Sequence, residues 1–226
     1  MSEDRASERA QSRREAAPAA ALVLVVLVLL ALISQSLGWE LVGLPWWVWL
    51  VLGIPALLLT IDLLLGFRGK GLVQSRNAAI VLLCLLAAGN FAALGILVAG
   101  LVSASTADLT GGELLLTGFA IYLSDVVVFG LVFWELEAGG PVARQRAHER
   151  DVVEFRFPQD DDQDTVGWKP QVWDYLYVSL TNAIAFSPTD TMPLSLRAKG
   201  MMSLESFVSA VTLLLVAARA VNVLGS

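Results

Sequence analysis

Five apolar runs, each close to the length needed to cross a bilayer, constrain this chain more than any other feature. They are Ala17–Ile33, Leu41–Leu65, Ala78–Val102, Glu113–Phe133 and Ser203–Leu224. A transmembrane helix needs about 20 predominantly apolar residues. Charged residues make up 16% of the chain, whereas about 25% is usual in soluble domains. In lipid, each segment must satisfy its own backbone polar groups, which favours helices. The sequence therefore predicts an all-α, polytopic membrane protein.

A sixth apolar run, Asp174–Phe186, is too short to cross a bilayer and ends in the polar turn Ser187-Pro188-Thr189-Asp190. Non-helical backbone at membrane depth is tolerated only where protein or water satisfies its polar groups. A short helix followed by such a turn predicts a re-entrant segment, which gives five spans and one pore-like half-helix. The alternative is six spans, in which Val172–Met192 crosses entirely.

These runs divide the chain into four parts. Residues 1–16 mix arginines and acids with few apolar side chains, which predicts a disordered tail. Residues 17–137 hold four predicted transmembrane helices, and residues 138–172 form a hydrophilic acidic loop. Residues 173–226 combine the half-helix with the last span, so that they predict one C-terminal module.

Basic residues are distributed unevenly between the connecting segments. The N-terminal tail carries four, Gly66–Asn77 three and Ala138–Val172 five, whereas the two connections after the first and third spans carry none. Segments rich in Lys and Arg stay on the cytoplasmic side of a membrane. The pattern predicts a multi-pass protein of the cell membrane with its N-terminus and its long loop in the cytoplasm.

The C-terminal module resembles the pore module of tetrameric potassium channels. The shared order is a short helix, a turn ending in Asp190, Pro193, a small basic linker with Arg197 and Lys199, and a long helix. In that family the filter is Thr-Val-Gly-Tyr-Gly-Asp, and residues 185–190 stand in its place. The module also resembles uncharacterised bacterial membrane proteins with a Tyr-Leu-Tyr-x-Ser-x-Thr motif, which residues 175–181 match.

The resemblance to channels implies a pore loop within a homotetramer that passes monovalent cations. Both filter glycines are replaced here, and Pro188 removes a backbone donor. We therefore expect weakly selective cation permeation, with Asp190 supplying a ring of four carboxylates. Potassium channels insert this loop from outside, whereas the charge pattern here inserts it from the cytoplasm, as in ionotropic glutamate receptors.

Two alternatives to a channel stay open. The first is a secondary transporter with a broken helix at Ser187-Pro188 and a proton site at Asp125. The second is a membrane scaffold or sensor that moves no ion and docks a partner through the loop at residues 138–172.

Polar residues inside the apolar runs are candidates for function because they are costly to insert into lipid. Asp125 and Asn90 lie near the middle of neighbouring predicted spans. Asp125 either carries an ion or a proton, or joins the two helices through Asn90 or Ser124. Asp62 lies near a span end, where it could pair with Arg68. Glu205 begins the last span, where it could line a pore mouth or pair with Lys199 or Arg197.

Oxygen-bearing side chains gather around the polar turn, and oxygens are the ligands that hard cations prefer. The filter-like set is Thr181, Asn182, Ser187, Pro188, Thr189, Asp190 and Thr191. The plainer alternative is a turn that Asp190 caps.

No pattern in the sequence predicts an enzyme, a cofactor site, a metal site or nucleic-acid binding. The single cysteine, Cys84, lies in an apolar run, and the single histidine, His148, lies in the charged loop. Asp160-Asp161-Asp162-x-Asp164 lacks the Gly and the distal Glu of a calcium-binding hand. The predicted partners are the lipid bilayer, further copies of the chain and monovalent cations.

Overall fold

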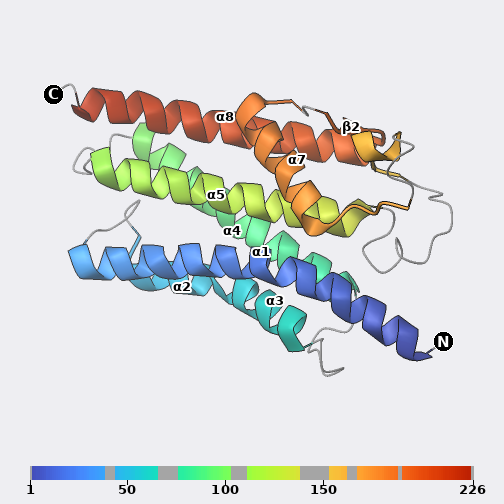
Figure 1. Ribbon diagram of the computed structural model, residues 1–226. Helices are drawn as coiled ribbons and strands as arrows, with labels where there is room; N and C mark the ends of the chain where they lie inside the picture. The colour runs from blue at the N-terminus through green and yellow to red at the C-terminus, as the bar shows by residue number, and fades with distance from the viewer. Residues whose placement is uncertain are drawn as a thin grey trace.

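The computed structural model describes residues 2–38, 44–65, 76–102, 111–137, 153–161, 167–187 and 190–224. These residues are almost entirely helical, which confirms the all-α prediction (Figure 1). The α-helices are α1 (Ser2–Leu37), α2 (Trp46–Leu52), α3 (Ile54–Leu65), α4 (Arg76–Val102), α5 (Gly111–Leu136), α7 (Val172–Ala185) and α8 (Leu196–Leu224). A short 3-10 helix, η4 (Pro158–Asp160), and two strands, β1 (Phe155–Arg156) and β2 (Met192–Pro193), complete the described elements.

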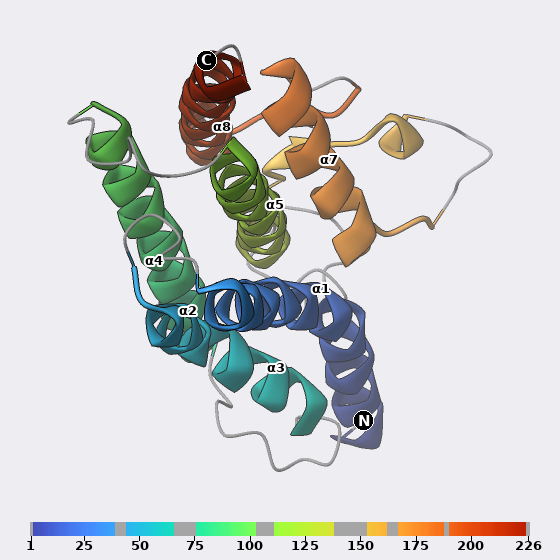
Figure 2. The ribbon, with the colours of Figure 1, turned by 90° about the vertical axis from the view of Figure 1, so that its left-hand side faces the viewer.

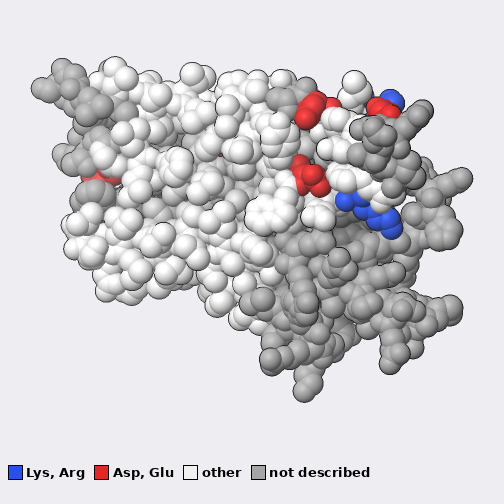
Figure 3. Space-filling view, viewed as in Figure 1, with Lys and Arg blue, Asp and Glu red and all other residues white. Residues whose placement is uncertain are grey.

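Four helices are long and apolar enough to cross a membrane, which supports the prediction of a multi-pass protein. The apolar stretches are Ala17–Leu37 in α1, Ile80–Ala99 in α4, Leu115–Leu136 in α5 and Leu196–Ala218 in α8. A shorter apolar stretch, Trp46–Ile61, covers α2 and most of α3. Figure 3 shows that most of the described surface on one face is uncharged, and that its basic side chains gather at the end near β2.

The second predicted span is broken where Pro55 predicts a kink. Helix α2 ends at Leu52, Gly53 forms a turn, and α3 starts at Ile54. Proline has no N–H to donate to the carbonyl four residues earlier, so the helical hydrogen-bond ladder is interrupted there. The N–H of Gly53 still donates to the carbonyl of Trp49, four residues earlier, and to that of Leu50, both at 3.1 Å.

Helix α1 differs from its prediction at the N-terminal end. It begins at Ser2, so residues 2–16, predicted to be a disordered tail, continue the helix. These residues are rich in Ala, Arg, Glu and Gln, which have high helix propensity, and a helix already formed over Ala17–Leu37 supplies the nucleus. Helix propensity and continuation from an existing helix thus outweigh the polar composition on which the expected disorder rested.

Helix α5 lies at the centre of the bundle, with α1, α4, α7 and α8 around it (Figures 1 and 2). Two glycines of α5 allow close approach. A Cβ at Gly118 would lie 2.9 Å from Val216 Cγ1 of α8 and even nearer to its Cγ2. A Cβ at Gly130 would lie 2.7 Å from Leu176 Cδ2 and 3.0 Å from its Cα, which belong to α7. Small residues thus bring three helix backbones together.

Helix α7 is short, and the chain on both of its sides leads to one end of the bundle. Its last residue is followed by Phe186 in the left-handed conformation (φ 55°), which stops the helix. The chain then returns to β2, which pairs antiparallel with β1.

Partial burial raises the pKa of Asp174 in the first turn of α7. The hydrogen bond that its Oδ2 accepts from the Gln171 N–H at 2.6 Å acts in the opposite direction.

Candidate functional site

Glu205 lies at the centre of a buried polar cluster between α5, α7 and α8. Its side chain is fully enclosed, with 0% exposure. Asn182 Nδ2 donates to Glu205 Oε2 at 2.7 Å, and Ser179 Oγ contacts Glu205 Oε1. Ser179 and Asn182 are three residues apart, which places both on the same face of α7. A carboxyl group of α8 therefore holds the half-helix against the bundle.

The side-chain amide of Asn182 makes three hydrogen bonds. Its Nδ2 also donates to the carbonyl of Met202 at 2.9 Å, and its Oδ1 accepts from Ser206 Oγ at 3.0 Å. With the bond to Glu205, these contacts fix the amide orientation, since only the nitrogen can donate. Asn182 thus belongs to the packed contact between α7 and α8.

Asp125 and Asn90 are hydrogen-bonded across α5 and α4, which is one of the alternatives that their positions in the sequence left open. Asn90 Nδ2 donates to Asp125 Oδ1 at 3.2 Å, and both side chains are buried. Asp125 Oδ2 is buried with no hydrogen-bond partner. Joining two helices satisfies only one of the two carboxyl oxygens, so Asp125 retains capacity to bind a further group.

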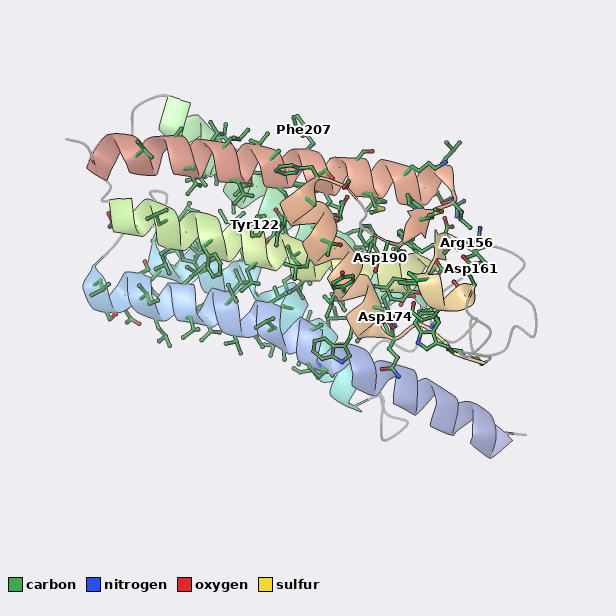
Figure 4. The ribbon with its side chains drawn as sticks, turned by 45° about the horizontal axis from the view of Figure 1, so that its top comes forward. Tyr122, Arg156, Asp161, Asp174, Asp190 and Phe207 are labelled. Atoms are coloured by element: carbon green, nitrogen blue, oxygen red, sulfur yellow. The ribbon has the colours of Figure 1, made fainter. Side chains whose placement is uncertain are left out.

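Tyr122 is a third ionisable group in this region and interacts with Glu205. Figure 4 shows it midway along α5, away from the end of the molecule that holds Arg156 and Asp161. Its hydroxyl is buried with no hydrogen-bond partner, and it interacts with the charge of Glu205, which in turn interacts with Asp125. The site thus combines two carboxyl groups and a phenol in the apolar middle of the bundle.

The filter-like residues do not converge on one point in the described part of the chain. Thr181 Oγ1 donates to carbonyls of its own helix, at Tyr177 (2.9 Å) and Val178 (3.1 Å). Thr191 is buried, whereas Ser187 and Asp190 are exposed. Pro188 and Thr189 lie outside the described residues. The oxygens predicted to form one filter are thus distributed between the helix interior and the surface.

Two other sequence-based candidates have different outcomes. Glu205 contacts α7, whereas the predicted pairing partners Arg197 and Lys199 are exposed on α8. The side chain of Asp62 lies outside the described residues. Sequence reasoning assigned Asn182 to the turn and left out Ser179, although their spacing of three residues on an otherwise apolar helix was a usable signal.

A second set of buried carboxyls anchors the segment between α5 and α8. Glu137 Oε2, at the end of α5, accepts the backbone N–H groups of Glu154 (3.1 Å) and Phe155 (2.9 Å). Ser195 Oγ donates to Glu154 and accepts the N–H of Ala198 at 3.0 Å, so it caps α8. The Leu194 N–H donates to the Glu154 carbonyl at 2.8 Å. These bonds fix where α8 starts relative to α5.

Aromatic rings continue this anchor into the bundle. Phe133 of α5 lies 5.2 Å from Phe155 of β1, centroid to centroid, and Phe155 lies 6.1 Å from Tyr175 of α7. Phe157 contacts Tyr175 at 5.4 Å and Trp168 at 5.5 Å. The Phe133–Phe155 pair is tilted and the other three pairs are edge-to-face, an arrangement that stabilises a packed core. The start of α7 is therefore held by rings, and its middle by the polar cluster.

The described residues contain no group of three or more His, Cys, Asp or Glu side chains placed to hold a metal ion. Comparison with protein-family models, with curated proteins and with solved structures gives no match to this chain.

Proposed function

We propose that the protein is a cation-permeable membrane protein of the pore-loop type, with five spans and one re-entrant half-helix. In this arrangement α1, α4, α5 and α8 cross the membrane, and α2 with α3 forms the remaining, broken span. Helix α7 enters the bilayer from the side of the long loop and the chain returns to that side. The fold-back of α7, fixed at one end by the β1–β2 pairing, is the observation that supports this proposal most directly.

The outer face of α7 supports assembly into a homotetramer. Apolar side chains spaced about one helical turn apart are exposed along it: Trp173 (56%), Tyr177 (50%), Leu180 (40%) and Ile184 (59%). In a pore-loop tetramer the half-helix of each copy faces neighbouring copies, so that such a row is covered by protein. The exposed Phe207 on α8, seen at the outside of the bundle in Figure 4, extends the apolar surface.

Asp190 carries the charge selectivity in this proposal. It follows the turn at the end of α7 and is exposed in the single chain, so four copies would place four carboxylates around a common axis. A ring of like charge raises the local concentration of counter-ions about 10–10³-fold. The residues at 185–190 lack the two glycines of a potassium filter, so we propose weak discrimination between monovalent cations.

Flux into liposomes tests this function. We expect the purified, reconstituted protein to pass K⁺ and Na⁺ at similar rates and to exclude Cl⁻. Asp190→Asn should reduce the preference for cations over Cl⁻ by about tenfold or more, since the local counter-ion excess is lost. The tetramer should remain intact by light scattering in detergent.

Asp161→Asn is the matched control, because Asp161 is an exposed carboxylate that lies outside the turn after α7 and pairs with Arg156. Its selectivity should equal that of the unmodified protein. Strong preference for K⁺ over Na⁺ would contradict the filter argument. Absence of flux from a folded protein would contradict the channel and favour a scaffold or sensor.

A secondary transporter is the second candidate, and the unpartnered Asp125 Oδ2 favours it. An ionisable group inside a membrane protein often marks an ion or proton pathway. In the same liposomes, a transporter would accumulate cations in response to a pH gradient, and Asp125→Asn would abolish that accumulation. A channel would show downhill flux only.

The side on which the long loop lies can be measured directly. We expect Gln159→Cys, made in a Cys84→Ser background, to resist an impermeant thiol reagent in intact cells and to react after the membrane is opened. Gln159 is exposed in η4, so burial in the protein does not explain resistance. Rapid labelling in intact cells would place the long loop outside the cell. The half-helix would then enter the membrane from outside, as it does in potassium channels.

A further inference from the structure

If Glu205 were an ionised carboxylate, the single hydroxyl hydrogen of Ser179 would face two acceptors, the Val126 carbonyl and Glu205 Oε1. Ser179 Oγ lies 2.7 Å from the carbonyl oxygen of Val126 and also contacts Glu205 Oε1. A hydroxyl carries one hydrogen, and a carbonyl oxygen can only accept. If Ser179 donates to Val126, the contact with Glu205 needs a hydrogen on Glu205. The full set of bonds is satisfied when Oε1 carries a proton and donates to Ser179.

The other oxygen of Glu205 fits the same assignment. Oε2 accepts from Asn182 Nδ2 at 2.7 Å, which is the role of the carbonyl oxygen in a neutral carboxylic acid. The second hydrogen of Asn182 Nδ2 goes to the carbonyl of Met202. One proton on Glu205 thus completes a chain of donors and acceptors that runs from α8 through α7 to α5.

The described residues around Glu205 provide no positive charge. From α5 it faces Tyr122 and Asp125, from α7 it meets the neutral Ser179 and Asn182, and α4 contributes Asn90 through Asp125. No Lys, Arg or His among the described residues interacts electrostatically with it. Two carboxyl groups near each other in a low-dielectric site cannot both ionise without a counter-charge. Among the described residues, no positively charged group donates to the Oδ2 atom of Asp125.

We propose that Glu205 and Asp125 form a proton-binding site inside the membrane, in which Glu205 holds the proton and hydrogen-bonds to Ser179 of α7. The Glu205 O–H bond breaks when the proton leaves to water, and the carboxylate keeps the electron pair. Ionised Glu205 competes with Val126 for the single hydrogen of Ser179 and carries a charge in an apolar site. Helix α7 therefore packs tightly against α5 and α8 only while the proton is bound. This site does not depend on whether the turn after α7 conducts ions.

Infrared difference spectra of the protein in lipid nanodiscs, taken between low and high pH, test the proton directly. We expect a C=O band of a protonated carboxyl that shifts in D₂O, disappears as pH rises and is absent in Glu205→Gln. Asp174→Asn is the matched control, since Asp174 is a half-buried carboxyl at the start of α7. That variant should keep the band. A carboxyl region unchanged by Glu205→Gln would overturn the assignment.

Hydrogen exchange tests the coupling to α7. We expect protection factors of α7 amides, corrected for the intrinsic pH dependence of exchange, to fall by up to about tenfold for each pH unit between the pH at which an exposed glutamate ionises and the titration midpoint of Glu205, and to level off above that midpoint. In Glu205→Gln they should not vary with pH, because the amide nitrogen donates to Ser179 and the amide oxygen accepts from Asn182. Equal pH dependence in both proteins would overturn the coupling.

Two further measurements keep the proposal testable if Glu205→Gln does not fold. Ser179→Ala removes the acceptor for the Glu205 proton, so the carboxyl band should move to higher frequency; an unmoved band would contradict the proposed bond. Repeating the titration at several Na⁺ concentrations separates a proton from a metal cation. A midpoint that moves with Na⁺ would assign the site to a cation and overturn its assignment to a proton.

Discussion

Replacing Gly130 by alanine is expected to lower the free energy of unfolding by about 1–3 kcal/mol, the usual cost of overpacking a close contact. The new Cβ would lie 2.7 Å from Leu176 Cδ2 and 3.0 Å from Leu176 Cα. Leu176 can turn its side chain, but its Cα moves only if α7 moves as a whole. The substitution should therefore also loosen α7, and hydrogen exchange of α7 amides should accelerate.

Gly95→Ala in α4 is the matched control, because a Cβ there would meet nothing within 4 Å. It should leave stability unchanged or raise it by about 0.5–1 kcal/mol, since Ala loses less backbone entropy than Gly in a helix. Thermal unfolding in the same detergent compares the two. Equal effects of the two substitutions would show that α7 does not approach α5 closely at Gly130.

The lengths of the apolar runs predicted which segments form long helices, but they located the helix ends less closely. Helix α4 is Arg76–Val102 against a predicted Ala78–Val102, because an apolar run of that length has one low-energy structure in lipid. Helix α8 starts at Leu196, seven residues before the predicted Ser203. Hydropathy locates the membrane, whereas the start of this helix is set by Ser195, which caps it outside the apolar run.

Depth along a helix was predictable, but rotation about its axis was not. Asp125 and Asn90 both lie at mid-span in neighbouring helices, and this shared depth made their contact one of the alternatives that the sequence offered. The partner of Glu205 depends on which face α7 turns toward α8. That rotation is set by the close contact at Gly130 and by the ring contacts of Tyr175, which are tertiary features.

The glycines show the same limit. Helix α4 contains Gly89, Gly95 and Gly100, and glycine in a transmembrane helix generally permits close helix approach. A Cβ at Gly95 would meet nothing, and one at Gly89 would meet only Leu52 Cδ2 at 3.3 Å. The closest approaches involve Gly118 and Gly130 in α5 instead. A glycine in a span permits close packing, but the position of the neighbouring helix decides whether the space is used.

Glu137→Ala is expected to have a larger effect than Gly130→Ala, with a loss of about 2–6 kcal/mol in the free energy of unfolding. Glu137 is fully buried, and its Oε2 accepts two backbone N–H groups, those of Glu154 and Phe155, which are themselves buried. Each buried donor left without an acceptor costs about 1–3 kcal/mol. The loss should extend to β1 and β2, because β1 begins at Phe155.

Glu137→Gln separates the effect of the charge from that of the hydrogen bonds, since its amide oxygen can accept the same N–H groups. Hydrogen bonds to a charged group contribute about 1.5–3 kcal/mol, and those to a neutral group about 0.5–1.5 kcal/mol. The free energy of unfolding of Glu137→Gln should therefore lie between those of the unmodified protein and of Glu137→Ala. The β1–β2 pairing fixes the return of the chain after α7, so Glu137→Ala should also expose the start of α8 to protease. If Glu137→Ala were as stable and as protease-resistant as the unmodified protein, then Glu137 would not hold the chain in its folded-back path.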